Sequence, residues 1–304
     1  MPGYSAEEYA RSLVHIGEPM QLPRSGGWVL IRKLPGRSLY DAVGCYPVFS
    51  CRRWEAISED LKELSSDIIC LSVVTDSAND VSPAVLMRSF PDVCYRYKDH
   101  YFADLTRPLN TFVSHHHRRN ARQALKSLRI ERLEVPANHL SSWVDMYDAL
   151  VHRHRIVGAA AFSRESFDHQ LRVPGLRAYA AFVGDEIVGM ILWMVDDQTA
   201  YYHLAAYSDA GYMQKASFGL FDYCLTAFSE EGIHRAALGG GAGTFASSDG
   251  LTRFKQGWSN ETRPTYFCGR ILDHDRYAQL VAQSGTETDS YFPAYRAPRL
   301  SAAG

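Results

Sequence analysis

Hydrophobic and polar residues alternate in short blocks through the second half of the chain. Between residues 176 and 207, three apolar runs are separated by two polar turns, Gly184–Asp185 and Asp196–Asp197. Short apolar runs joined by tight turns are typical of antiparallel strands. We therefore expect a three-stranded meander over Leu176–Val183, Ile187–Val195 and Thr199–Tyr207.

A longer period, with apolar residues three or four positions apart, occurs on both sides of this meander. Such spacing places the apolar residues on one face of a helix. It predicts helices over Thr111–Leu128 and His139–Arg155 before the meander, and over Tyr212–Glu230 after it. The predicted order then continues with a strand at His234–Leu238, a helix at Leu251–Gly257, a strand at Tyr266–Leu272 and a helix at Arg276–Gln283.

The first third of the chain mixes short strands and helices. Trp28–Leu34 and Asp67–Thr75 read as strands, Ala56–Leu64 has helical spacing, and alternating aromatic and polar residues over Asp92–Leu105 predict a pair of strands. A chain of 304 residues has room for two domains. We expect a mixed α/β fold, with one domain over residues 1–135 and a second over 136–304.

Three consecutive glycines, Gly239, Gly240 and Gly241, follow the strand predicted at His234–Leu238. Glycine has no Cβ, so its backbone adopts positive φ easily and another molecule can approach it closely. Asp249 is placed to cap the helix that follows. The run therefore predicts a ligand-binding turn, and the alternative is a flexible loop.

Basic residues gather on the helix predicted over Thr111–Leu128, and no acidic residue occurs between Ser114 and Ile130. Ala121, Leu125 and Leu128 form an apolar stripe that would anchor the helix. A separate stripe of positive charge favours binding to phosphate groups, and the alternative is a solvated face partnered by acids from elsewhere. The positive stripe consists of Arg118, Arg122, Lys126 and Arg129, with Arg119 beside it.

Composition excludes several function classes. The formal net charge is −2, so a polyanion must be met by a local patch. No apolar run approaches the roughly 20 residues that span a membrane, and the N-terminus lacks the apolar segment of a secretory signal. The six cysteines are scattered without metal-binding spacing. We therefore expect reduced, buried thiols, a cytoplasmic protein and no metal site.

Five segments together carry a resemblance to a known family. The segments are HHHRRNARQAL at His115–Leu125, GDEIVGMILWM at Gly184–Met194, YYHLAAYSDAGYMQKAS at Tyr201–Ser217, LGGG at Leu238–Gly241 and DGLTRFKQGWS at Asp249–Ser259. With the order of predicted elements, they resemble the Gcn5-related N-acetyltransferase (GNAT) superfamily, and more narrowly its Fem-type branch. The resemblance implies tandem GNAT-like domains, each a central, mostly antiparallel sheet flanked by helices.

Members of that superfamily transfer an acyl group to an amine, so the resemblance implies an acyltransferase. It also implies a splayed strand pair, in which the strand ending near Tyr207 presents backbone amides to the acyl carbonyl. The Fem-type branch commonly takes its acyl group from an aminoacyl ester on tRNA and makes an amide bond without ATP.

Relatives that use coenzyme A carry a pyrophosphate loop of the pattern Arg/Gln-x-x-Gly-x-Gly/Ala. Here Gln214 agrees with the first position, but Ser217 stands at a glycine position. Phe218 would obstruct the pyrophosphate if its ring faced the helix N-terminus. This departure favours a tRNA-borne donor and leaves Gln214 as a candidate substrate contact.

Candidate catalytic residues lie on the third strand of the meander and just after it. In an alternating strand, Tyr201, His203 and Tyr207 share one face. His203 could accept the amine's proton, and Asp209 could orient the ammonium group or act as base. The alternative for His203 is a hydrogen-bonded core histidine, and the alternative for Asp209 is a turn or cap residue. An aminoacyl ester is already activated, so positioning can supply most of the rate without a strong base.

Lys255 lies in the segment Phe254–Trp258, which matches the pattern FKxG(F/W) of the family that the chain resembles. Its ammonium could meet a phosphate or the developing negative oxygen, and the alternative is a surface lysine.

The sequence thus predicts an aminoacyltransferase that forms an amide on a small-molecule amine or peptide acceptor, in peptide natural-product or cell-wall precursor biosynthesis. Aminoacyl-tRNA would be the co-substrate, with no cofactor. The first alternative is an N-acetyltransferase that uses acetyl-CoA, and the second is a non-catalytic RNA-binding module.

Overall fold

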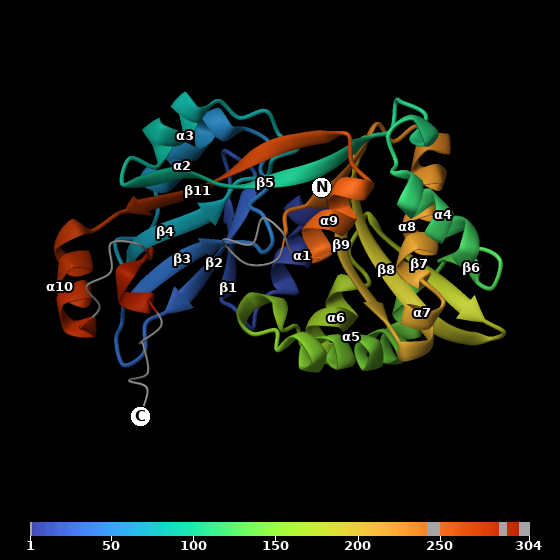
Figure 1. The fold of residues 1–304 in the computed structure, drawn as a ribbon. Helices are drawn as coiled ribbons and strands as arrows, with labels where there is room; N and C mark the ends of the chain where they lie inside the picture. Colours follow the sequence, from blue (N-terminus) through green and yellow to red (C-terminus); the bar gives the residue numbers. More distant parts are fainter. Residues whose placement is uncertain (1, 242–249, 286–290, 298–304) are drawn as a thin grey trace. The chain divides into compact units, whose positions relative to one another are not determined.

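The computed structural model describes residues 2–241, 250–285 and 291–297. The chain forms two compact units (Figure 1). Unit 1 contains the residues up to Ser12 together with Lys98–Pro264, and unit 2 contains Leu13–Tyr97 together with the chain from Thr265 on. Each unit therefore combines two separate stretches of sequence. The bounds of these compact units differ from the domain division expected at residue 135. The division into tandem domains at that residue stays a prediction.

Unit 1 contains a mostly antiparallel sheet with the strand order β5-β10-β9-β8-β7-β6. The pair β9–β10 is parallel, and the other neighbouring pairs are antiparallel. The meander β7-β8-β9 confirms the three strands that the apolar runs predict. The strands are β5 (Val93–Asp104), β6 (Arg129–Leu133), β7 (Leu176–Val183), β8 (Glu186–Asp196), β9 (Thr199–Tyr207) and β10 (Arg235–Gly239).

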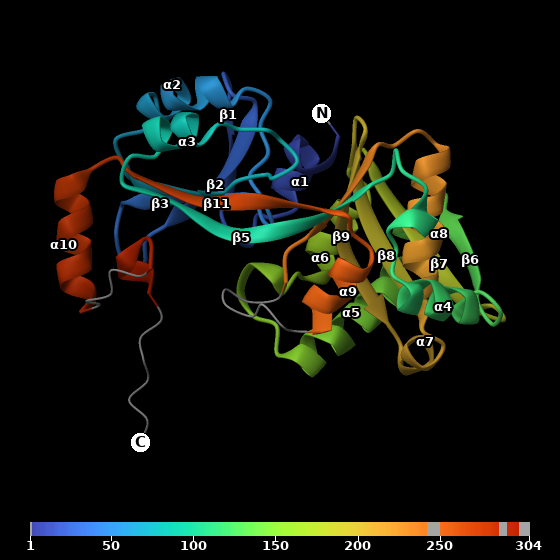
Figure 2. The same ribbon diagram turned by 45° about the horizontal axis from the view of Figure 1, so that its top comes forward.

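Helices cover both faces of this sheet (Figure 2). Trp193 of β8 packs on one face with Ala121 of α4 and Phe221 of α8. Helices α5 and α6 cover the opposite face, where the rings of Trp143 and Phe167 lie 5.5 Å apart. The helices are α1 (Glu7–Arg11), α4 (His115–Ala124), α5 (Leu140–His154), α6 (Arg164–Gln170), α7 (Asp209–Met213), α8 (Ala216–Glu230) and α9 (Gly250–Gly257).

The helix predicted over Thr111–Leu128 is shorter in the structure. Ser114 caps it by accepting the backbone N–H of His117, so α4 begins at His115. The helix ends at Ala124, and the chain then turns into β6, which starts at Arg129 and pairs with β7. The prediction that Arg129 continues the basic stripe of the helix is therefore wrong.

The part of the sheet in unit 2 has the strand order β1-β2-β3-β4-β11-β5. Strands β3 and β4 are parallel, whereas β1–β2, β2–β3 and β4–β11 are antiparallel. Residues 92–105, predicted as a strand pair, form the single long strand β5, which extends into both units, as does β11. The strands are β1 (Glu18–Leu22), β2 (Gly27–Lys33), β3 (Tyr40–Gly44), β4 (Ile68–Val74) and β11 (Glu261–Ile271).

Buried residues of β4 pack against two helical layers of unit 2. Leu71 and Val73 belong to the core formed with α2 (Ile57–Lys62) and α3 (Pro83–Ser89). Ile69 packs instead with Leu280 of α10 (His274–Ser284). The mixed α/β class and the mostly antiparallel sheets flanked by helices are therefore confirmed.

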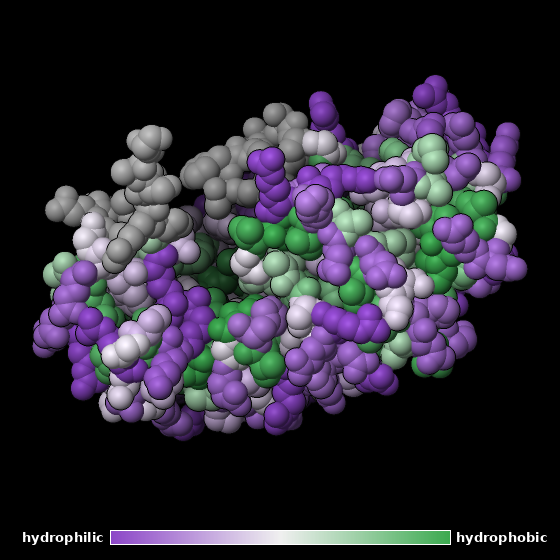
Figure 3. Space-filling view, turned by 90° about the horizontal axis from the view of Figure 1, so that it is seen from below, coloured by the Kyte–Doolittle hydropathy of each residue, from purple (hydrophilic) through white to green (hydrophobic). Residues whose placement is uncertain are grey.

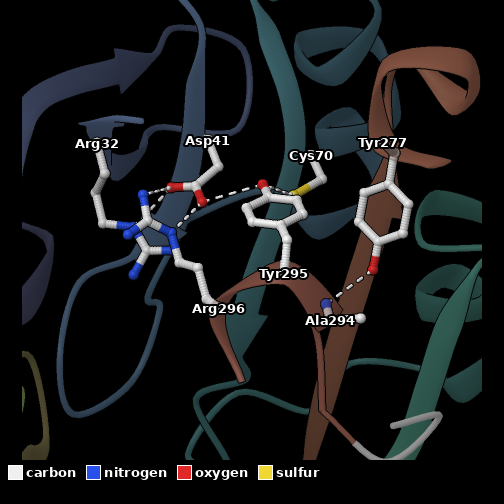
Figure 4. Close-up of polar contacts among 7 residues, drawn as sticks. All are labelled: Arg32, Asp41, Cys70, Tyr277, Ala294, Tyr295 and Arg296. Carbon is white, nitrogen blue, oxygen red and sulfur yellow. Dashed lines mark hydrogen bonds and ion pairs between the residues drawn. The ribbon is translucent and has the colours of Figure 1, made fainter. Parts of the chain in front are cut away.

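Polar contacts fasten the 3₁₀ turn Ala294–Arg296 to the strands of unit 2 (Figure 4). Asp41 of β3 is fully buried and pairs with both Arg32 and Arg296. The hydroxyl of Tyr295 donates to Asp41 and lies 3.1 Å from the thiol of Cys70. These contacts hold the end of the described chain against β3 and β4.

Among the residues that the structure describes, no helix is both long and apolar enough to cross a bilayer. On the face shown in Figure 3, hydrophilic residues surround smaller apolar patches. All six cysteines are free thiols; Cys94 is half-buried and the other five are buried.

Candidate functional site

Strands β9 and β10 lie side by side for only part of their length. Their parallel pairing runs from Arg235–Thr199 to Ala237–Tyr201. Beyond Tyr201, β9 continues to Tyr207 beside β8, whereas β10 continues to Gly239 beside β5. The two strands therefore part after Tyr201, which is the splayed pair that the family resemblance implied.

Lys255 of α9 lies at this splay. Its Nζ atom donates to the backbone carbonyl of Gly240 at 2.6 Å and lies 5.4 Å from the centre of the Tyr202 ring. Gly240 follows the end of β10, and Tyr202 is the first residue of β9 beyond the paired part. The side chain is only 6% exposed, so the alternative of a surface lysine does not apply.

The first two glycines of the turn are explained by packing within unit 1. Gly239 has a φ of +73°, which favours glycine, and a Cβ there would lie 3.3 Å from the ammonium of Lys255. A Cβ on Gly240 would lie 2.6 Å from Cδ of Lys98 and 3.2 Å from Cδ2 of His100. Gly241 precedes residues 242–249, so the predicted polar turn and the cap at Asp249 lie outside the described residues.

Positive charge gathers around this turn. Burial, together with the nearby charges of Lys255 and Lys98, lowers the pKa of His100 to about 3. At neutral pH His100 is therefore uncharged, while two ammonium groups lie close to it. Such a site is suited to stabilising negative charge that develops on an oxygen atom.

A β-bulge changes which residues of β9 share a face. Leu192 pairs with Leu204 and Trp193 with Tyr202, so His203 is an extra residue in β9. Tyr207 consequently packs with Tyr202 on the α8 side. His203 faces the other way, and the prediction that His203 and Tyr207 share a face is wrong. The sequence does not reveal the bulge, because one extra residue within an apolar strand leaves no distinct pattern.

His203 is buried in a polar network of unit 1. One ring nitrogen lies 3.1 Å from the hydroxyl of Tyr4, and the other lies 3.0 Å from Oε1 of Gln170. Burial lowers the pKa of His203 to about 3. This environment matches the alternative of a hydrogen-bonded core histidine.

Asp209 occupies the first turn of α7, after the cap residue Ser208. Its carboxylate is exposed and pairs with Arg153 at 2.6 Å. The structure does not bring Asp209 to His203, which faces α6 through Gln170. The alternative of a turn or cap residue comes close to this position, since Asp209 directly follows the cap residue.

Arg119 and Arg122 of α4 are exposed, as is Lys126 in the turn that follows this helix, whereas Arg118 is half-buried. Within the described residues none of these four side chains forms an ion pair, and the buried Nε of Arg118 has no hydrogen-bond partner there. Burial raises the pKa of Asp222 of α8, and the charge of nearby Arg122 partly offsets this rise.

Leu125, predicted to anchor the helix, is 41% exposed. His117 and Asn120 are buried instead, together with Ala121 and Ala124. The buried face of the helix therefore differs in part from the apolar stripe that the sequence predicts. Two of its buried positions carry polar side chains that have hydrogen-bond partners.

The segment that corresponds to a pyrophosphate loop is hydrogen-bonded to α4 and the turn after it. Lys215, in the left-handed conformation, donates to the side chains of Asn120 at 2.8 Å and Gln123 at 2.7 Å. Gln214 accepts from the hydroxyl of Ser127. The ring of Phe218 packs against Phe254, with 5.2 Å between the ring centres.

Lys98, His100 and His117 lie near Lys255 and are not among the candidate site residues given above. Lys98 and His100 belong to the segment Lys98–Tyr101, which resembles a substrate-side segment of the family but also reads as a strand edge. The position of His117 three residues after the cap residue Ser114 is a signal that could have singled it out. Among the described residues, no cluster of three potential metal-ligating side chains occurs.

Comparison with known proteins supports the resemblance. A family model described as "Acetyltransferase (GNAT) domain" matches residues 114–256. This stretch runs from the cap of α4 into α9 and includes both the basic helix and Lys255. A comparison with curated proteins found no match.

Solved structures share the fold over most of the chain. FemX is 11% identical, with a TM-score of 0.66 over 90% of this chain and 93% of the FemX chain. The C-terminal domain of a putative lysylphosphatidylglycerol synthetase from Agrobacterium fabrum is 15% identical, with a TM-score of 0.61 over 92% of this chain and 91% of that domain. L-PGS from Bacillus licheniformis is 14% identical, with a TM-score of 0.57 over 92% and 96% of the two chains.

At these identities the similarity establishes the fold alone. Residues 114–256 therefore match an acetyltransferase (GNAT) domain, and the chain has the fold of FemX.

Proposed function

We propose that this protein transfers an aminoacyl group from aminoacyl-tRNA to an amine on a small-molecule or peptide acceptor. The observation that carries the proposal is the placement of the Lys255 ammonium on the Gly240 carbonyl at the splay of β9 and β10. A fixed positive charge next to the part of β9 that is no longer paired with β10 is suited to stabilising the negative charge that develops on the carbonyl oxygen of an acyl group during transfer.

In the proposed reaction the acceptor nitrogen attacks the ester carbonyl carbon of the donor. The carbonyl oxygen gains negative charge, which Lys255 and the backbone of β9 beyond Tyr201 stabilise. The ester C–O bond then breaks, the ribose oxygen leaves with a proton that the attacking amine loses, and an amide remains. The ester is already activated, so holding the two reactants together supplies much of the rate.

His203 and Asp209 have no part in this scheme. The nitrogens of His203 lie within hydrogen-bond distance of Tyr4 and Gln170 on the other side of the sheet, and Asp209 is paired with Arg153. Tyr207 lies on the Lys255 side with Tyr202, and it would line the donor path.

Two observations favour a tRNA-borne donor over acetyl-CoA. Arg119, Arg122 and Lys126 form an exposed basic edge suited to RNA phosphates. Gln214 and Lys215, at the place of a pyrophosphate loop, are hydrogen-bonded to side chains of residues 120–127. The names of the similar structures also include a lysylphosphatidylglycerol synthetase, which points to aminoacyl chemistry on this fold.

The proposal is tested by incubating the purified protein with pooled amine acceptors and one of two labelled donors. The donors are a mixture of charged tRNAs and acetyl-CoA. We expect labelled amide from the charged tRNAs and none after RNase treatment. Product from acetyl-CoA alone supports the acetyltransferase alternative, and tight RNA binding without product from either donor supports the binding module.

A further inference from the structure

Helix α9, which carries Lys255, ends against the first turn of α4. The last carbonyls of a helix lack partners inside the helix. Here the carbonyl of Phe254 accepts from Nε2 of His117 at 3.0 Å, and the carbonyl of Gly257 accepts the backbone N–H of Ser114 at 2.9 Å. The start of α4 therefore caps the end of α9.

His117 is held in one orientation by its own bonds. A carbonyl can only accept, so Nε2 carries the proton that is donated to Phe254, and Nδ1 accepts from the hydroxyl of Ser114 at 2.7 Å. The same hydroxyl oxygen accepts the backbone N–H of His117. The tautomer and the plane of the ring follow from these contacts.

Packing encloses the same ring. A Cβ on Gly257 would lie 2.1 Å from Cε1 of His117, so the ring stands directly against the backbone of α9. The ring centres of Phe218, Phe254 and Trp258 lie 5.1, 5.4 and 5.2 Å from that of His117. A helix of eight residues is marginal by itself, so its placement depends on contacts of this kind.

We propose that His117 is a positioning residue for Lys255. It holds the carbonyl of Phe254, one residue before Lys255, and thereby sets where the ammonium meets Gly240. The contribution to transfer rests on the proposed function, whereas the placement of Lys255 does not. Because His117 belongs to α4, the exposed basic edge and the lysine are tied together through one side chain.

The placement is tested without turnover by measuring how fast an amine-modifying reagent labels each lysine, by mass spectrometry on the folded protein. In His117→Leu, we expect Lys255 to be labelled about threefold faster or more, since local opening becomes easier. Lys126, already exposed, should be unchanged. Gly257→Ala, which displaces the ring from the other side, should act in the same direction.

Two matched variants separate positioning from a general loss of packing. His117→Gln keeps an amide N–H near the position of Nε2, so it should restore slow labelling of Lys255. His115→Leu changes an exposed histidine of the same helix and should leave all rates unchanged. Unchanged labelling of Lys255 in folded His117→Leu overturns the proposal.

A double-mutant cycle tests the consequence for transfer. His117→Leu should lower kcat about tenfold by misplacing the ammonium, with KM for the donor nearly constant. In a Lys255→Met background the same change should lower kcat by less than about twofold, because the group that it positions is gone. If His117→Leu lowers kcat by the same factor in both backgrounds, the positioning role of His117 is contradicted. Absence of any transfer by the unaltered protein counts against the proposed function, while the labelling comparison still judges the placement.

Discussion

The ammonium nitrogen of Lys255 lies 2.6 Å from the carbonyl oxygen of Gly240, so a charged group from α9 is fixed at the end of β10. The contact joins two segments that are separated in sequence by residues 242–249. It also explains why glycine occupies position 239, where a Cβ would approach the same nitrogen.

Removing this charge should impair the chemical step. We expect Lys255→Met to lower kcat about 100-fold, the usual loss when one donor to a developing oxyanion is removed. Steady-state kinetics with charged tRNA give the measurement. Arg253→Met, which removes an exposed charge from the same helix, is the control and should retain activity. Equal activity of the two variants would remove Lys255 from the mechanism.

The basic edge of α4 should determine the salt dependence of RNA binding. Arg119→Ala combined with Arg122→Ala should flatten the plot of log Kd against log salt by about one to two units, because up to two phosphate contacts are lost. Filter binding at several salt concentrations measures this slope. Arg11→Ala with Arg172→Ala removes two exposed charges elsewhere in unit 1 and should leave the slope intact. A slope that the α4 variant does not alter excludes this edge as the RNA contact.

The buried carboxylate of Asp41 should be important for the stability of unit 2. Asp41→Ala leaves Arg32 and Arg296 without their shared partner (Figure 4). Breaking a buried ion pair costs about 3–5 kcal/mol of unfolding free energy. Urea denaturation measures the loss, and Glu59→Ala, which removes an exposed carboxylate of the same unit, should have little effect. Similar midpoints for the two variants would contradict the assigned role of Asp41.

His203 should make the folded protein sensitive to acid. Its pKa in the folded state is about 3, below the value of about 6.5 expected in the unfolded chain. Between these values the unfolded chain binds a proton that the folded chain does not, so the free energy of unfolding falls as the pH falls. Above pH 6.5 the contribution is fully present.

The variant His203→Phe should therefore have a shallower pH dependence of stability. The slope should fall by up to about 1.4 kcal/mol per pH unit between pH 6 and 4, which corresponds to one proton. Urea unfolding at successive pH values gives the slopes, with the exposed His152→Phe as control. Equal slopes for His203→Phe and the unaltered protein would show that His203 titrates normally.

Local patterns predicted the meander well, because tight turns and apolar runs determine it with few distant contacts. The segments Leu176–Val183 and Thr199–Tyr207 appear as β7 and β9 with the expected bounds. The sequence pattern does not predict strands β1, β3 and β6, since each has only five residues and partly exposed positions. Such short strands are determined by pairing with their neighbours, and β1 and β6 lie at the two ends of the strand order.

The site shows a similar limit. The motif around Lys255 identifies the lysine, but it does not show that the carbonyl of Gly240 accepts from it, nor that the neutral His100 of the distant strand β5 lies nearby. The bulge at His203 reversed the faces of the strand beyond it. A single extra residue in one strand leaves no signal in an alternating pattern, so the constellation of His203 with Tyr207 could not be tested from the sequence.

In the proposed function, the acyl end of a charged tRNA lies at Lys255. Its position is measured by the labelling of lysines by an amine-modifying reagent in the presence of a tRNA that carries its amino acid through a stable amide. We predict that this analogue protects Lys255 and Lys126, and that uncharged tRNA protects Lys126 far more than Lys255. Protection of Lys255 by acetyl-CoA, with none from the charged analogue, would show that the donor at this lysine is not a charged tRNA.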